Sequence, residues 1–259
     1  MIGLNGGLLG AARTSRRGAA VGTWTLNEQI LYQRQNAWIG DASFDSVSLL
    51  LHMDGSNGST TFTDSSSNIF TVTANGNAQI STTQSKFGGA SGYFDGTGDY
   101  LESTSSAYLF GTGDFCIEFW FNASAAFSGT AQTFCGVWSS SNFAWIAQAT
   151  STSVSCSFGN GSAFSTSISN NWTAPSTGTW NHLAITRSGT AAYLFMNGSQ
   201  LSTATVSTNI SGTGTMSIGR NTDGNQQYFT GYIDEFRITK GAARYTASFT
   251  APTAPFPNL

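Results

Sequence analysis

The chain has 259 residues, of which 13% are aromatic and only 9% are charged, and its formal net charge is −3. Disordered chains are poor in aromatic residues, so this composition indicates a folded protein, and its many Gly, Ser and Thr residues favour β-structure. The weak, slightly acidic charge excludes an electrostatic nucleic-acid binder. No apolar run reaches the length of a membrane-spanning helix, so we expect no membrane partner.

Residues 1–46 differ in composition from the rest of the chain. Residues 1–22 are rich in Gly, Ala and Arg and show no periodicity, which predicts an extended arm. A short helix follows, with Thr25 as its N-cap and Glu28 at the capping-box spacing. The large apolar side chains here have no domain of their own, so we expect them to pack on another chain. The predicted assembly residues are Trp24, Leu26, Ile30, Tyr32, Trp38, Arg13, Arg16 and Arg17.

We do not expect the N-terminus to be a secretion signal, because its Leu8-Leu9 pair precedes the arginines rather than following them. Three cysteines, Cys116, Cys135 and Cys156, are an odd number, which argues against a disulfide framework. We interpret them as small buried side chains of a protein made in a reducing compartment.

From Val47 onward, short runs of strand formers alternate with Gly, Asn and Ser turns, which predicts about fourteen strands in an all-β, two-sheet antiparallel jelly-roll sandwich. The clearest signal is a meander at 180–201, where Asn197-Gly198 favours a type I′ hairpin turn. The other expected strands are 47–52, 69–74, 78–81, 92–95, 100–102, 115–121, 132–138, 143–149, 153–158, 215–219 and 231–239.

The carboxylates argue against catalysis. Glycosidases need two acids about 5–10 Å apart, and this sequence has only four glutamates. Glu118 lies on a predicted strand, but Trp120 and Phe121 occupy the positions where acidic partners would lie, so it has none along its strand. His52 and His182 lie within apolar strands and are expected to be structural. We therefore predict that the protein is not an enzyme.

Six segments together resemble the laminin G-like branch of the concanavalin A-like lectin/glucanase superfamily. They read LLLHMDG (49–55), GYFDGTGDYL (92–101), FCIEFWF (115–121), WNHLAITR (180–187), LFMNG (194–198) and GYIDEFRI (231–238). The resemblance rests on the order and spacing of these six segments over some 200 residues. It implies two stacked antiparallel sheets with one concave face, and a first and last strand that lie side by side.

The N-terminal arm, with WTLNEQ at 24–29, and the closing ARYTASFTAPTAPFP at 243–257 are similar to virion proteins of tailed bacteriophages. This resemblance implies an assembly arm, 1–46, before a laminin G-like domain, 47–259. It further implies a non-enzymatic structural protein of the virion, made in the bacterial host cytoplasm, as a capsid decoration or a tail appendage. The implied partners are other virion proteins, further copies of this chain and host-surface glycans. The alternative is a free carbohydrate-binding lectin.

The superfamily resemblance also implies candidate ligands, although no cofactor is required. Laminin G-like domains often hold calcium, and Asp54 and Asp234 would lie close together if the first and last strands pair. The competing interpretation is that these aspartates only form turns.

Aromatic residues are the candidates for stacking on sugar rings. Trp120, Trp138 and Trp145 lie in strands and are expected in the core, whereas Trp172 lies in polar loop sequence. The polar loop 220–229 could contact a glycan or a neighbouring subunit. The predicted contact residues are Trp172, Asp223, Asn225 and Tyr228.

Overall fold

A computed structural model describes residues 40–221 and 227–258. The chain divides into a large compact unit, Ser46–Phe256, and a second unit, Met1–Asp45 with Pro257–Leu259. The predicted arm residues and the short helix lie outside the described residues, as do Asp223 and Asn225. The assembly arm therefore stays a prediction.

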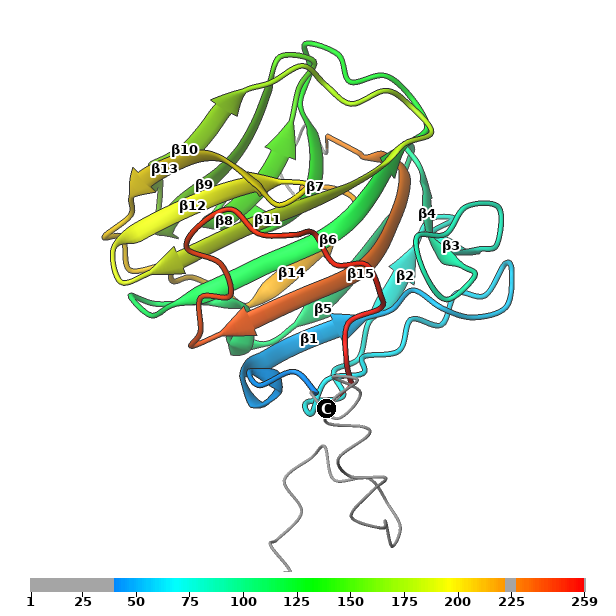
Figure 1. Cartoon of the computed structure of the whole chain (residues 1–259), viewed down its shortest axis with the longest axis horizontal. Coiled ribbons are helices and arrows are strands. Elements are labelled where there is room, and N and C mark those ends of the chain that lie inside the picture. The colour runs from blue at the N-terminus through cyan, green and yellow to red at the C-terminus, as the bar shows by residue number, and fades with distance from the viewer. Residues whose placement is uncertain (1–39, 222–226, 259) are drawn as a thin grey trace, which may run out of the picture. The chain divides into compact units, whose positions relative to one another are not determined.

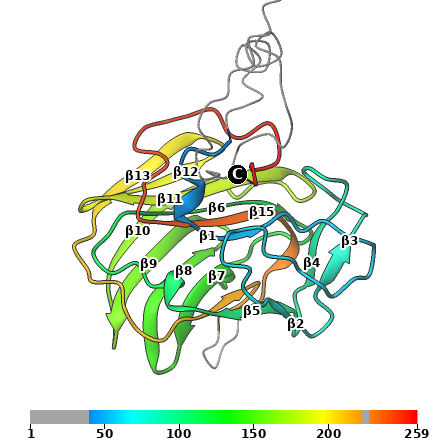
Figure 2. The same ribbon diagram turned by 90° about the horizontal axis from the view of Figure 1, so that it is seen from below.

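The large unit is a sandwich of two antiparallel sheets, which confirms the predicted fold class (Figures 1 and 2). The eight-stranded sheet holds β13 (Ser199–Thr205), β12 (Ala191–Met196), β11 (Trp180–Ser188), β6 (Phe115–Ala123), β15 (Thr230–Lys240), β4 (Ser91–Asp95) and β3 (Gln79–Ser81) in that order, and β1 (Val47–Leu51) also pairs with β15. The seven-stranded sheet holds β10 (Phe164–Asn171), β9 (Ser153–Gly161), β8 (Asn142–Ala149), β7 (Gln132–Ser139), β14 (Thr215–Ile218), β5 (Tyr100–Thr104) and β2 (Thr73–Asn75).

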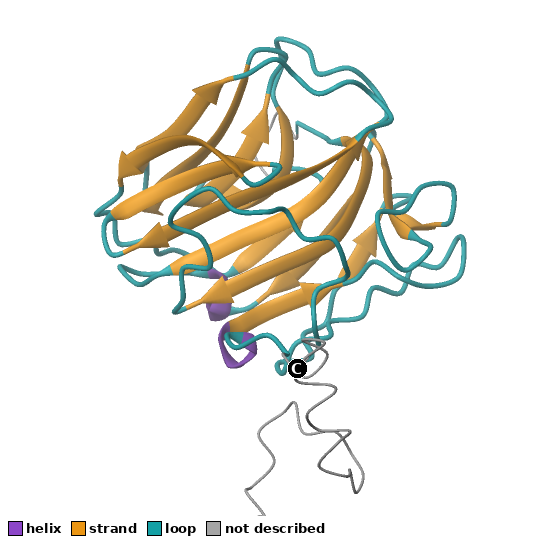
Figure 3. Ribbon diagram, in the orientation of Figure 1, coloured by secondary structure: helices purple, strands orange, loops and turns teal. Residues whose placement is uncertain are grey.

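Helical structure among the described residues is limited to two 3-10 turns, η1 (Phe44–Ser46) and η2 (Ser106–Tyr108) (Figure 3). In the same part of the chain, no helix is long and apolar enough to cross a bilayer.

The alternation of side chains along β6 explains which of its residues enter the core between the two sheets. Phe115, Ile117, Phe119 and Phe121 point between the sheets and are fully buried. Because strand side chains alternate, the residues between them face the outer surface of the eight-stranded sheet. The outer surface thus receives Cys116, Glu118, Trp120 and Asn122.

The first and last strands pair, as the resemblance implies. β1 aligns Leu51 with Phe236, whereas β4 aligns Gly92 with Ile233 on the same side of β15. A bulge separates Asp234 from Arg237 in the pairing with β6. Asp234 and Glu235 therefore occupy the junction where the partner of β15 changes from β4 to β1.

The meander at 180–201 is confirmed as β11 and β12 leading into β13. Asn197 and Gly198 have φ values of 51° and 81°, as a type I′ turn requires. All three cysteines are free and buried, as expected.

One local prediction was wrong, and one strand was missed. The strand expected at 69–74 is only Thr73–Asn75, because Asp64 instead holds a tight loop through the backbone N–H groups of Leu50, Ser66 and Phe70. The edge strand β10 was not predicted, since its Ser- and Thr-rich sequence buries only Ile168.

Candidate functional site

The predicted calcium ligands flank one loop at the β1–β4 junction. The Asp234 side chain is fully buried, and its Oδ2 accepts the N–H groups of Lys86 and Phe87 at 2.7 and 3.1 Å. Burial raises the pKa of Asp234 to about 7. Asp54 is exposed, and its carboxylate lies where a Cβ at Gly88 would be. Both aspartates therefore contact the loop 86–88.

This arrangement does not supply the ligand set of a calcium ion, which takes six to eight oxygens. Among the described residues, no group of three or more His, Cys, Asp or Glu side chains could hold a metal ion. Calcium binding at Asp54 and Asp234 stays a prediction, and a melting temperature that does not change on chelation would remove it.

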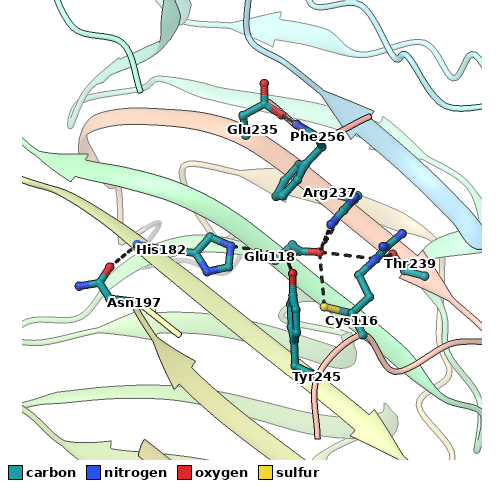
Figure 4. Close-up of polar contacts among 10 residues, drawn as sticks. Cys116, Glu118, His182, Asn197, Glu235, Arg237, Thr239, Tyr245 and Phe256 are labelled. Carbon is teal, nitrogen blue, oxygen red and sulfur yellow. Dashed lines mark hydrogen bonds and ion pairs between the residues drawn. The ribbon is translucent and has the colours of Figure 1, made fainter. Parts of the chain in front are cut away.

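Glu118 is the centre of a buried polar cluster on the outer face of the eight-stranded sheet (Figure 4). Arg237 donates to Glu118 Oε1 from Nε at 2.9 Å and from Nη2 at 2.7 Å. The Tyr245 hydroxyl donates to Oε2 at 2.9 Å, and Arg244 Nε lies 3.5 Å from Oε1. His182 Nε2 is 3.4 Å from Oε2, which is too long for a strong hydrogen bond.

The ion pairs fix the charge of this carboxylate. Burial alone would raise the pKa of Glu118, but Arg237, His182 and Arg244 together hold it well below its usual value. A carboxylate with a depressed pKa cannot act as a general acid near neutral pH. Glu118 therefore anchors the structure instead of offering a proton.

What Glu118 anchors is residues 241–256, here called the strap. In Figures 1 and 2 the strap (red) crosses the outer face of β11, β6 and β15. Its Tyr245 and Phe249 rings stack at 3.5 Å, and the Phe249 N–H donates to the Gly198 carbonyl at 2.8 Å. The strap thus covers the half of this face that contains Glu118 and His182.

A second carboxylate secures the end of the strap. Glu235 Oε1 lies 2.7 Å from His52 Nδ1, and its Oε2 accepts the Phe256 N–H at 2.7 Å. The Arg237 guanidinium also lies 3.7 Å from the centre of the Phe256 ring. The expectation that His52 and His182 are structural agrees with these contacts.

Of the predicted loop contacts, only Trp172 and Tyr228 lie among the described residues. The Trp172 indole N–H donates to the Thr150 carbonyl at 2.9 Å, and its half-buried ring lies 5.5 Å from Phe127. Tyr228 is half-buried. Their role in glycan contact stays a prediction.

The strand tryptophans differ from one another. Trp145 is fully buried in the core, as expected, but Trp138 is half-buried against Phe143 and Phe164. Trp120 is 5% exposed but lies on the outer face, where Lys86 Nζ is 3.9 Å from its ring centre. Loop side chains therefore cover Trp120, and it is not a core residue.

A row of aromatic and amide side chains crosses the outer face beside the strap. Direct cross-strand pairing aligns Gln79 with Tyr93, Tyr93 with Tyr232, Tyr232 with Asn122, and Asn122 with Trp180. Their neighbours Ile80, Phe94, Ile233 and Phe121 are buried in the core, which places the row on the outer side. We call these five residues, Gln79, Tyr93, Tyr232, Asn122 and Trp180, the aromatic row.

The aromatic row offers both ring faces and hydrogen-bonding groups. Asn122 is buried, while the other four members are half-buried. The Tyr93 and Tyr232 rings lie 5.0 Å apart at 39° to each other. Sequence reasoning missed this row, because its members come from five strands whose order only the topology reveals.

Three buried polar atoms, one in the row and two beside it, have no hydrogen-bond partner within the protein. They are Asn122 Nδ2, Trp120 Nε1 and Asp234 Oδ1. Trp120 is two residues from Asn122 on β6 and pairs directly with Asp234 on β15. Buried polar atoms without partners are costly, so such a cluster indicates a place for water or a ligand.

Comparison with known families identifies the chain. A family model described as the concanavalin A-like lectin/glucanases superfamily matches residues 95–244. The chain belongs to this superfamily, as the sequence motifs implied. A comparison with curated proteins finds none that matches.

Solved structures with a similar fold include binding domains of Paraclostridial Mosquitocidal Protein 1 and of botulinum neurotoxins. The binding domain of Paraclostridial Mosquitocidal Protein 1 is 16% identical, with a TM-score of 0.62 over 77% of this chain and 50% of that one. The binding domain of botulinum neurotoxin serotype D is 18% identical, with a TM-score of 0.58 over 77% and 49%. The binding domain of botulinum neurotoxin DC, solved in complex with SialylT, is 17% identical, with a TM-score of 0.56 over 77% and 49%. At these identities the similarity shows the fold, and this chain spans about half of each structure.

Proposed function

We propose that this chain is a non-enzymatic, lectin-like protein that binds carbohydrate through the outer face of its eight-stranded sheet. The observation that carries the proposal is the aromatic row. Aromatic rings pack against the C–H faces of sugar rings, and neighbouring amides bind their hydroxyls. A botulinum neurotoxin binding domain, about half of which matches this chain in fold, was solved in complex with SialylT, and this supports a glycan as the ligand class.

A hydrolytic function has little support from the carboxylates. Hydrolysis of a glycosidic bond needs a general acid and a second carboxylate next to the substrate. Both oxygens of Glu118 and both oxygens of Glu235 are already engaged by partners under the strap. Burial raises the pKa of Asp234 to about 7, but Glu118 and Glu235 are engaged by these partners and neither is free to act as its second carboxylate.

The setting that we propose is the virion of a tailed bacteriophage. This part of the proposal rests on the resemblance of the arm and of the closing segment to phage virion proteins. The arm would dock on capsid or tail proteins and on further copies of the chain after synthesis in the host cytoplasm. The sandwich would then be displayed to host-surface glycans. A free lectin would use the same face but would need no arm.

A glycan array probed with the full-length protein tests the carbohydrate function. We expect binding to at least one class of glycan and no release of reducing sugar from that glycan. Binding to no glycan on the array would contradict the proposed function. Release of reducing sugar would replace it with a hydrolase.

A further inference from the structure

We infer that the aromatic row binds an uncharged, unbranched oligosaccharide that runs across the strands, from Gln79 on β3 to Trp180 on β11. This inference rests on the proposed carbohydrate function and specifies its site and ligand class. It follows from the direction in which the row crosses the strands, from the uncharged side chains of the row, and from the unpartnered polar atoms in and beside it.

The direction follows from the strand pairing. Each member of the row is the direct cross-strand partner of the next, so the row runs perpendicular to the strands. Neighbouring strands lie about 4.8 Å apart, so the four intervals between five strands span about 19 Å. One interval is comparable in length to one pyranose unit. The row therefore matches an extended chain of about four sugars.

The row has natural ends. Gln79 lies on the edge strand β3, beyond which the sheet does not continue. At the other end, the pairing of β12 with β11 begins only at Leu183, so β12 places no residue beside Trp180. The contact length is thus limited to these five strands, and sugars beyond it would gain no further contacts.

The chemistry of the row favours a neutral ligand. Its members are three aromatic and two amide side chains, without any charge. Lys86 lies over the ring of Trp120, beside the row, at 3.9 Å. Asp95 lies on the same face of β4 as Tyr93, two residues away, and would repel an acidic sugar. Recognition of carboxylated or sulfated sugars usually needs Arg or Lys, which this row lacks.

The unpartnered atoms give the row polar groups that the protein does not satisfy. Asn122 is 1% exposed and Trp120 is 5% exposed, and each has an N–H donor without an acceptor. Asp234 Oδ1, opposite Trp120, is an unused acceptor. Only Asn122 Nδ2 belongs to the row itself, so it is the donor that a ligand hydroxyl on the row would meet, whereas Trp120 Nε1 and Asp234 Oδ1 lie under the loop 86–88.

Calorimetric titration of the full-length protein tests the inference. The probes are linear gluco-oligosaccharides and N-acetylglucosamine oligosaccharides from the disaccharide to the hexasaccharide, with oligogalacturonates of equal length and sialyllactose as acidic probes. We expect affinity for a neutral series to rise up to about the tetrasaccharide and then to level off. We expect the acidic probes to bind at least tenfold more weakly.

Two row variants and one control locate the binding. Tyr232→Ala and Trp180→Ala should each weaken binding about tenfold or more, since each removes an aromatic anchor. Tyr193→Ala is the control, because Tyr193 is a half-buried tyrosine of the same sheet that pairs with Thr186, away from the row. It should leave the affinity unchanged. Circular dichroism shows whether each variant folds. Because the two row variants lie at separate positions, the site can still be tested if one of them does not fold.

The outcomes separate this inference from the function on which it rests. Stronger binding of acidic probes would overturn the neutral ligand class and leave a lectin. If neutral oligosaccharides bind both row variants as tightly as the wild type, the proposed site is wrong, but the protein remains a lectin. A positive glycan array without binding in either neutral series would also overturn the inference alone. A negative array would overturn both.

Discussion

The carboxyl group of Asp234 makes the stability of the fold depend on pH. Burial raises its pKa from 3.8 to about 7, so the folded state holds this proton more tightly than the unfolded chain does. Between these two values the folded state binds more protons than the unfolded state. The contribution of Asp234 to the free energy of unfolding therefore falls as pH rises from about 4 to about 7, and it is constant above.

Asp234→Asn should remove this dependence. The difference in free energy of unfolding between Asp234→Asn and wild type should change by an amount on the order of 4 kcal/mol between pH 4 and pH 8, in favour of the variant at pH 8. Contributions from other groups, such as Glu118, cancel in this difference. Urea unfolding at several pH values measures it, with Asp95→Asn as the control. A difference that does not vary with pH would contradict the assignment.

Ile69 adopts a conformation that a β-branched residue rarely occupies. Its φ is 52°, and its side chain is 76% exposed. The left-handed conformation costs about 1–2 kcal/mol for a residue with a Cβ, and burial does not offset the cost here.

Ile69→Asn should therefore raise the free energy of unfolding by about 1 kcal/mol, because Asn tolerates this conformation. Thermal or urea unfolding measures the change. Thr71→Asn is the control, since Thr71 is exposed nearby and has no positive φ. An equal gain in both variants, or a loss in Ile69→Asn, would show that strain at Ile69 is not the cause.

At the scale of elements, the turn between β12 and β13 determines how closely the strap approaches. Gly198 has a φ of 81°, and a Cβ there would overlap the Phe249 carbonyl oxygen and the Ala251 nitrogen. The Phe249 N–H in turn donates to the Gly198 carbonyl. The strap therefore needs glycine at this position for space as well as for conformation.

Gly198→Ala should loosen the strap. Gly189→Ala is the matched control, because Gly189 has a φ of 59° in the preceding hairpin but open space around its Cβ position. We expect Gly198→Ala to lose about 1–2 kcal/mol more stability than the control. Hydrogen exchange should show lost protection of the Phe249 amide in Gly198→Ala alone. Equal effects in both variants would mean that the strap does not depend on this contact.

Elements with strong local signals could be predicted from the sequence. The alternation along β6 and the Asn197-Gly198 turn reflect local physics, and the structure confirms both. β10 could not be predicted, because an edge strand with one buried side chain leaves almost no hydrophobic pattern. The loop around Asp64 overrode the strand propensity of 69–72, since four hydrogen bonds to its carboxylate satisfy the turn.

At the scale of the whole molecule, the sequence predicted the fold but not the candidate site. Alternation along a strand predicted that Glu118 and Trp120 share a face opposite to Phe119 and Phe121, but not which way Trp120 faces, because it was expected in the core. The alignment of Tyr93, Tyr232 and Trp180 was not predictable, because it depends on which strands become neighbours. Long-range pairing of β15 with both β4 and β6 brings these residues together.

Deletion of residues 1–46 tests the separation of assembly from folding. Residues 46–256 form a compact unit of their own, so we expect the truncated protein to remain folded and soluble. Without its arm it should no longer join phage particles, as measured by its content in purified virions. A mixture with the full-length protein provides the control for particle assembly. Normal incorporation of the truncated protein would contradict the arm proposal.

The central claim is that the outer face of the eight-stranded sheet binds carbohydrate, and NMR titration of the full-length protein tests it most directly. The ligand is the oligosaccharide that binds most tightly on the array and in calorimetry. The account predicts shifts of the Trp180 indole signal and of the Tyr93 and Tyr232 ring signals, with the Trp172 indole unchanged. Shifts confined to Trp172 and Tyr228, with the aromatic row unaffected, would contradict it.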